Sequence, residues 1–250
     1  MKNSESTFLE PEAAEAFLRR MGVAGPDSDF HCLQQQMTQA MAGPQDCRTV
    51  PPYRWEDAII EELIRPGDSV LDLGCGNGEL LARLAAQHPL SCQGVEQDSQ
   101  AVLQCLRLGI PVFQGDLQHV LATCAERSYS FAILERTLQT LPRPVETLRE
   151  MLRVADSAVV SFPNFAHWSV RLSFSLGGRM PVTGSLPYNW YDTPNIHLCS
   201  ITDFLDWVGS EGLAVRAAWV LVQQEVLPFA AQEHNITAEE ALFVLERPPR

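Results

Sequence analysis

A regular alternation of short apolar segments and amphipathic helices runs from Tyr53 to Asn164, and it restricts the fold more than any other feature. Five segments of strand type occur in this region: SVLDLG, SCQGVEQD, PVFQGD, SYSFAILER and SAVVSFPN. Strands that alternate with helices form mostly parallel sheets through right-handed crossovers, with helices on both faces. The sequence therefore predicts a three-layer α/β/α domain.

The rest of the chain departs from this rhythm in three places. Residues 1–52 carry two amphipathic stripes and predict an N-terminal helical extension that precedes a main domain at 53–250. Residues 165–199 are rich in Gly, Pro and aromatic residues, which favours a functional insertion, either a lid or a docking segment. After a capping signal at Ser200 we expect one more helix, and then two final strands, LAVRAAWVLVQ and ALFVLER, joined by a polar loop.

Composition excludes several classes of protein. Eighteen basic residues against 31 acidic ones give a net charge of −13, which disfavours nucleic acid as a partner. No apolar run approaches the length of a membrane span, and the start of the chain lacks the pattern of a secretory signal. Seven scattered cysteines without a CxxC pair argue against a disulfide framework and a zinc site. We therefore expect a cytoplasmic protein that binds neither membranes nor nucleic acid.

The segment VLDLGCGNGELL is the strongest local motif, because a buried strand runs through a glycine turn directly into a helix. Glycines permit positive φ and let a ligand approach the backbone, and the helix N-terminus offers free N–H groups. Gly74, Gly76 and Gly78 follow a GxGxG pattern, whereas a dinucleotide site requires a third glycine where Glu79 stands. Asp72 beside the turn would repel a pyrophosphate and suits a cationic amino-acid group better.

Two further acids follow the second and third predicted strands. Glu96 ends strand two, where a carboxylate can accept hydrogen bonds from both ribose hydroxyls, and Asp116 follows strand three, where it can accept from an adenine amino group. Each acid alone has a simpler interpretation as a turn residue or a helix cap. Acids after three successive parallel strands would share one crevice at the carboxyl ends, which favours a ligand site.

These residues resemble the class I S-adenosylmethionine-dependent methyltransferase fold, a Rossmann-like fold of seven strands with the last one antiparallel. The resemblance implies S-adenosyl-L-methionine as cofactor, with its methionine and ribose portion over the three glycines. It further implies Glu96 at the ribose hydroxyls, Asp116 at the adenine, and Asp72 at the turn or the amino group.

A narrower resemblance covers roughly residues 56 to 222. In this region the chain is similar to the methionine-biosynthesis MetW family, and the segments that carry the similarity are VLDLGCGNGELL, GVEQD, QGDL, ILERTLQTL, EMLRV, SFPNFAHWSVRL, GRMPVT and LPYNWYDTPNIHLCSITDF. The sequence departs from the family at the start of strand four, where Tyr129-Ser130-Phe131 replaces an FDxxIL pattern. The family resemblance implies an association with homoserine O-acyltransferase.

Two functions follow from this resemblance. The chain is either an accessory or regulatory partner of homoserine O-acyltransferase that binds S-adenosylmethionine, or a methyltransferase of an unidentified small molecule. The sequence lacks a GxSxG nucleophile motif, so we do not expect it to transfer acyl groups itself. A nucleic-acid methyltransferase is disfavoured by the acidic balance.

Candidates for a catalytic base lie in the insertion. His167 and His197 have the chemistry of a base, and Tyr191 belongs to an aromatic run that suits a sulfonium or ammonium. The alternative is that the aromatics cover the crevice or form a docking surface, while the histidines bind backbone groups. The histidines are dispersed, so no metal site is expected.

Overall fold

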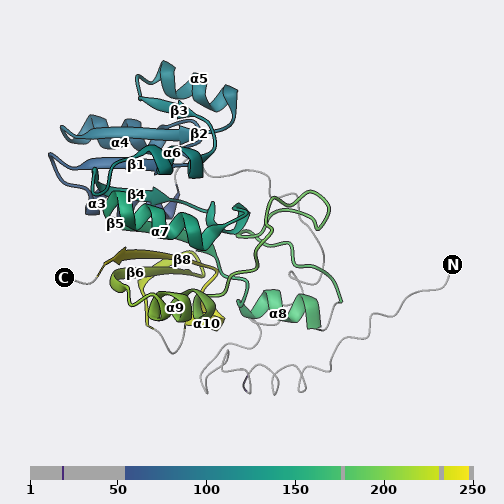
Figure 1. Cartoon of the computed structure of the whole chain (residues 1–250). Helices are drawn as coiled ribbons and strands as arrows, with labels where there is room; N and C mark the ends of the chain where they lie inside the picture. Colours follow the sequence, from purple (N-terminus) through teal and green to yellow (C-terminus); the bar gives the residue numbers. More distant parts are fainter. Residues whose placement is uncertain (1–18, 20–53, 176–177, 231–233, 248–250) are drawn as a thin grey trace.

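The computed structural model describes residues 19, 54–175, 178–230 and 234–247 (Figure 1). The predicted helical extension at 1–52 therefore lies outside the described residues, except at Arg19. The strands are β1 (Ser69–Leu73), β2 (Ser91–Glu96), β3 (Val112–Gln114), β4 (Tyr129–Leu134), β5 (Ala155–Pro163), β6 (Ala214–Val222), β7 (Glu225–Pro228) and β8 (Glu240–Glu246). The helices are α3 (Trp55–Leu63), α4 (Glu79–Gln87), α5 (Ser99–Arg107), α6 (Leu117–Thr123), the 3₁₀ turn η1 (Leu138–Thr140), α7 (Pro144–Val154), α8 (Trp168–Ser175), α9 (Ile201–Ser210) and α10 (His234–Thr237).

The strands form one mixed sheet in the order β3-β2-β1-β4-β5-β8-β6-β7. Strands β1 to β5 pair with one another in parallel, and β8 is antiparallel to both β5 and β6. The strand order reverses between β1 and β4, so the helices that follow these strands leave on opposite faces. A crevice at the carboxyl ends beside such a reversal is where open α/β sheets bind ligands.

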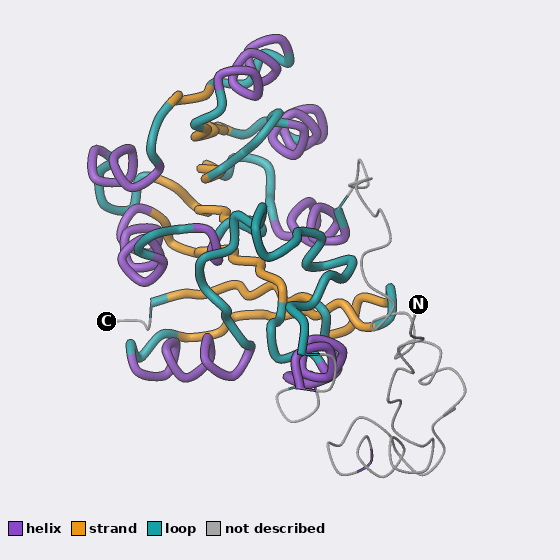
Figure 2. The backbone as a smooth tube through the Cα atoms, turned by 90° about the vertical axis from the view of Figure 1, so that its right-hand side faces the viewer, coloured by secondary structure: helices purple, strands orange, loops and turns teal. Residues whose placement is uncertain are grey.

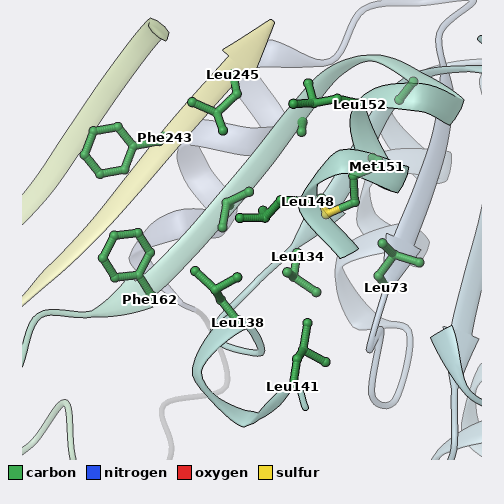
Figure 3. Packing of buried hydrophobic residues seen from close by; sticks show 14 of the residues in the cluster. Leu73, Leu134, Leu138, Leu141, Leu148, Met151, Leu152, Phe162, Phe243 and Leu245 are labelled. Atoms are coloured by element: carbon green, nitrogen blue, oxygen red, sulfur yellow. The ribbon is translucent and has the colours of Figure 1, made fainter. Parts of the chain in front are cut away.

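Helices cover both faces of the sheet, as the alternation predicts (Figure 2). Helices α6, α7 and α9 pack on one face through a large core in which Phe162, Phe243 and Met151 are fully buried (Figure 3). Helices α3, α4 and α5 pack on the other face through a second core. Within β1, Leu71 and Leu73 belong to the first core and Val70 to the second. Side chains alternate along a strand, so Asp72 lies on the face of α3 and α4.

The sheet has eight strands, and the expectation of seven is corrected here. The extra strand is β7, which forms an antiparallel hairpin with β6 inside the segment predicted as a polar loop. The hairpin turns at Gln223 and Gln224, whose φ values are +50° and +69°. Two-residue turns of this kind usually carry Asn or Gly, so a Gln-Gln turn gives no signal in the sequence. The predicted final antiparallel strand is β8, and it is present.

Among its described residues, the insertion at 165–199 contains one regular element, helix α8, which the sequence analysis did not predict. The last residues of the insertion lie beside η1, which follows β4. The backbone N–H groups of Ile196 and His197 both donate to the carbonyl of Gln139 in η1, at 2.9 and 3.0 Å. Figure 1 shows α8 and the loop after it on the side of the sheet where β5 ends. The insertion therefore lies beside the same edge of the sheet as the glycine turn.

Asn164 holds the base of this insertion. Its side-chain amide donates to the carbonyls of Asn235 and Ala238, at 2.9 and 2.8 Å. Its carbonyl oxygen accepts from the backbone N–H groups of Ala166 and Ile201. Asn164 is 1% exposed, so water cannot satisfy these groups if the bonds are lost.

We predict that Asn164→Ala lowers the free energy of unfolding by about 2–4 kcal/mol, because it leaves several buried backbone groups without partners. Urea denaturation of the variant and the parent chain measures the change. Asn189→Ala is the matched control, since Asn189 lies in the same insertion and only its backbone groups, which the substitution keeps, are hydrogen-bonded there. Equal stability of the two variants would contradict the role assigned to Asn164.

Candidate functional site

The turn between β1 and α4 adopts a conformation that requires glycine. The φ angle is +79° at Gly74, +52° at Gly76 and +77° at Gly78, all in the left-handed region. A Cβ atom on Gly78 would lie 2.9 Å from Cys105 Sγ on α5, whereas a Cβ on Gly76 would meet nothing within 4 Å. The turn is thus closed against α5 at Gly78 and open at Gly76. No side chain caps the start of α4, so its first N–H groups are available to a ligand.

The Glu96 carboxylate is tied to this turn. One oxygen accepts the N–H of Gly76 at 2.9 Å, and the other accepts the N–H groups of Gln97 and Asp98 at 2.7 and 2.9 Å. These bonds fix the carboxylate at the end of β2 and connect β2 to the glycine turn. A carboxylate has about four acceptor positions, so the arrangement leaves capacity for a ligand hydroxyl. The ribose role of Glu96 stays a prediction.

Asp116 has the helix-cap geometry that the sequence left open as an alternative. One of its oxygens accepts the N–H groups of Gln118 and His119 at 2.9 and 3.1 Å, so Asp116 is the N-cap of α6. Its other oxygen accepts from the Gln97 side chain at 3.3 Å. Gln97 follows Glu96 directly, so the ends of β2 and β3 lie side by side. The adenine role of Asp116 also stays a prediction.

Asp72 is the most deeply buried of the predicted acids, with 4% of its surface exposed. The pKa of its carboxyl group is raised to about 7, mainly by burial; the charge of Arg54 opposes this rise, and the charges of Asp57 and Glu96 add to it. The carboxyl group forms no hydrogen bond with any residue that the structure describes. A buried acid without a partner is held at a free-energy cost unless a proton or a cation accompanies it.

Glu135 is a site residue that the sequence analysis missed. It is the first residue after β4, its side chain is 10% exposed, and its Oε2 lies 3.7 Å from Arg54. Its other oxygen is buried without a partner among the described residues. Burial raises the pKa of Glu135 well above its usual range, and the charge of Asp72 raises it further. The signal was present in ILER, because an acid that ends strand four obeys the same rule that selected Glu96 and Asp116.

A buried ionic network stands next to Glu135. Arg136 has a left-handed φ of +47°, and its guanidinium pairs with Glu56 at 3.2 Å and with Glu240. The indole N–H of Trp55 donates to Glu240 at 2.7 Å. This network joins α3 and β8 to the end of β4. The Arg136 guanidinium is paired within this network and not with Asp72, so it does not balance the acids at the glycine turn.

The three catalytic candidates in the insertion occupy different environments. The His167 ring is 9% exposed, its Nδ1 lies 2.7 Å from Ser169 Oγ, and burial lowers its pKa to about 4, so the ring is neutral at pH 7. Tyr191 is 69% exposed and stacks edge-on against Trp190. His197 is exposed. No hydrogen bond or ring contact joins any two of these three described candidates, and their catalytic roles stay predictions.

A polar depression of about 440 Å³ adjoins the turn on the side of α5. Its lining residues are Asn77, Glu79, Asp98, Gln100, Ala101, Gln104 and Leu108. It opens between the N-termini of α4 and α5, next to the loop that carries Glu96. This depression extends the polar surface around the glycine turn.

A family model described as "Methionine biosynthesis protein MetW" matches residues 54–245. The chain belongs to the MetW family. The match runs from the first described residue of the domain into β8, and so extends beyond residues 56 to 222, which carry the sequence resemblance. The bifunctional methionine biosynthesis protein MetXA/MetW of Rhodopirellula baltica is 35% identical over 207 residues, which are 78% of this chain and 33% of the relative. The chain thus spans about a third of the length of this curated relative.

Solved structures with this fold include methyltransferases and a protein with another activity. A methyltransferase of Thermotoga maritima, described as a possible histamine N-methyltransferase, superposes with a TM-score of 0.55 at 13% identity and covers 77% of this chain and 87% of its own. The (4+2)-cyclase SpnF superposes with a TM-score of 0.57 at 13% identity and covers 87% and 94%. These likenesses confirm the predicted class I methyltransferase fold. The fold does not by itself decide the reaction.

Two searches of the described residues give negative results. Within those residues there is no group of three or more His, Cys, Asp or Glu placed to hold a metal ion. The helices of the described residues also include none with the length and apolar character needed to cross a bilayer.

We predict that Gly78→Ala destabilises the protein by about 2–4 kcal/mol, because the new methyl group combines left-handed strain with a clash against Cys105. Cys105→Ala in the same chain should recover about 1 kcal/mol or more relative to the sum of the single changes. Chemical denaturation of the single and double variants measures this coupling. Gly67→Ala is the control, since Gly67 has a φ of +92° and open space around its Cβ position. Additive effects of Gly78→Ala and Cys105→Ala would refute the contact.

Proposed function

We propose that this protein binds S-adenosylmethionine at the glycine turn and acts as an accessory or regulatory partner of homoserine O-acyltransferase. The observation that carries the cofactor assignment is the pair of buried acids, Asp72 and Glu135, beside a turn that is open at Gly76; one oxygen of Glu135 has no partner among the described residues. Membership of the MetW family supports the place in methionine biosynthesis.

The groups at the site match the chemistry of this cofactor. S-adenosylmethionine, when bound, supplies a methyl group on a positively charged sulfur, and it also carries an ammonium group, ribose hydroxyls and an adenine amino group. The crevice edge offers acceptors for all of these: Asp72 and Glu135 for positive charge, Glu96 for hydroxyls and Asp116 for the amino group. The free N–H groups at the start of α4 suit the cofactor's carboxylate.

The partnership with the acyltransferase is supported by the relative from Rhodopirellula baltica, which unites MetXA and MetW in one named protein. Fusion holds the two units at a high effective concentration relative to each other, which favours contact between an accessory subunit and its enzyme. S-adenosylmethionine is made from methionine, so a protein that binds it can report the level of the end product. Such a report requires that the cofactor change the affinity of this chain for the enzyme.

The exposed apolar side chains of the insertion offer a docking surface for the acyltransferase. They belong to one described segment of the loop after α8: Met180, Tyr188, Trp190, Tyr191, Ile196 and Leu198. Trp190 is 75% exposed, and large aromatic residues dominate the energy of protein interfaces. The end of the segment is fixed to Gln139, near the cofactor edge, so occupancy of the site has a short route to this surface.

The alternative is a methyltransferase of a small molecule. The shared fold favours it, because methyl transfer needs little beyond a bound donor and a positioned nucleophile. Among the described residues, His167, Tyr191 and His197 have no hydrogen bond to one another or to the glycine turn, so no assembled catalytic group favours the methyltransferase over the accessory function. A methylated product formed from cell extract by the parent chain and not by Gly76→Arg would favour the alternative.

We predict that Gly76→Arg lowers the affinity for S-adenosylmethionine by about 100-fold or more, because the side chain fills the space above the open part of the turn. Isothermal titration calorimetry measures the affinity. Gly109→Arg is the matched control, since Gly109 also has a positive φ of +74° with no atom within 4 Å of its Cβ position, but ends α5 away from the turn. Failure of the parent chain to bind S-adenosylmethionine or its demethylated product would refute the cofactor assignment.

We predict that Trp190→Ala weakens the complex with the cognate homoserine O-acyltransferase by about 10- to 100-fold and leaves cofactor affinity unchanged. Co-purification and an acylation assay with and without this chain measure the effect. Leu106→Ala on α5 serves as control, because Leu106 is 57% exposed but lies outside the insertion. The absence of a complex, together with an unchanged acylation rate, would refute the partnership.

A further inference from the structure

Among the described residues, the candidate site contains more buried acidic groups than basic groups to balance them. Asp72 and Glu135 come from neighbouring parallel strands: Asp72 pairs in register with Ile133, and Glu135 lies two residues after Ile133, just past the end of β4. Both side chains are at least nine-tenths buried, and one oxygen of Glu135 has no partner in the described chain. The two acids are close enough for the charge of Asp72 to raise the pKa of Glu135.

The basic groups around this pair are mostly engaged elsewhere. Arg54 approaches Glu135 to 3.7 Å, at the outer limit of an ion pair, and its side chain is 40% exposed. Arg136 is bound to Glu56 and Glu240. Arg83 is bound to Asp57 and Glu61. The charges that face the pair therefore come from the start of α3 (Arg54, Glu56, Asp57), from β2 (Glu96) and from Arg136 after β4.

We propose that Asp72 and Glu135 form a cation site that makes the protein prefer S-adenosylmethionine to S-adenosylhomocysteine. This inference depends on the proposed cofactor assignment and deepens it. The two ligands differ by one methyl group and by the positive charge on sulfur, and share the ammonium, carboxylate and adenosine groups. A buried pair of acids needs more than one positive charge, and only the methyl donor supplies a second.

The preference has a regulatory consequence. Many sites that bind both compounds respond to their ratio, because the compounds have nearly the same shape. A site that reads the sulfonium charge responds to the methyl donor alone, since electrostatic attraction in a desolvated crevice is strong. Occupancy would then follow the end product of methionine synthesis and ignore the by-product of methyl transfer.

Binding calorimetry tests the proposal with three probes: S-adenosylmethionine, S-adenosylhomocysteine and sinefungin, which carries an amine in place of the sulfonium. The expected result at pH 7.5 is that both cationic compounds bind about 10-fold or more tightly than S-adenosylhomocysteine. Glu135→Gln is expected to reduce this preference to about 3-fold or less without lowering the affinity for S-adenosylhomocysteine. Glu62→Gln, an exposed acid on α3, is the control and should keep the full preference.

The proton balance gives a second readout. The pKa of Asp72 is raised to about 7 in the free protein, so its carboxyl group is partly protonated at neutral pH. A bound cation favours the charged form, so S-adenosylmethionine should release more protons than S-adenosylhomocysteine. Its affinity advantage should therefore grow as pH rises from about 6 to 8. Titrations in two buffers of different ionisation enthalpy measure the protons released.

The outcomes separate the two proposals. Equal or tighter binding of S-adenosylhomocysteine, or a Glu135→Gln variant with an unchanged preference, overturns the cation site and leaves the cofactor assignment standing. Failure of all three probes to bind overturns the cofactor assignment, and the cation site falls with it. Thermal unfolding of Glu135→Gln shows that any loss is not a loss of fold.

Discussion

Parallel pairing of β1 with β2 and β4 is the constraint on which the site depends. Because these strands run in the same direction, each delivers its last residues to one edge of the sheet. The strand order reverses between β1 and β4, so the turn after β1 is not covered by the helix after β4. Every acid proposed to contact the cofactor lies near or just after the end of a strand at this edge: Asp72, Glu96, Asp116 and Glu135.

The sequence predicts most of the fold because nearly every element carries its own local signal. The buried strands read as apolar runs, α7 coincides with PVETLREMLRV, and Ser200 caps α9 as expected. The features that were missed lack such a signal. The hairpin at Gln223 has no turn residue of the usual type, and α6 has only seven residues, too few to show a helical period.

The candidate site was predictable in its residues but not in its hydrogen bonds. The turn glycines adopt the positive φ values that their spacing indicates. The sequence could not tell that Glu96 would bind the N–H of Gly76, because this bond depends on how β1 and β2 align. The cap of α6 by Asp116 is a local contact, and the sequence left it open as an alternative. Glu135 was overlooked because the strand-end rule that selected Glu96 and Asp116 was not extended to the fourth strand. Its burial beside Arg54 depends on how α3 packs, which the sequence does not show.

The ionic network around Arg136 links residues that are far apart in the chain. Glu56 lies at the start of the domain and Glu240 at the start of its last strand, and both bind the same guanidinium. Arg136 therefore has its full set of partners only after β8 has entered the sheet between β5 and β6. During synthesis, Arg136 and Glu56 must wait for more than a hundred further residues to emerge. Such long-range closure slows folding, so the cofactor edge is among the last parts of the domain to become rigid as the new chain leaves the ribosome.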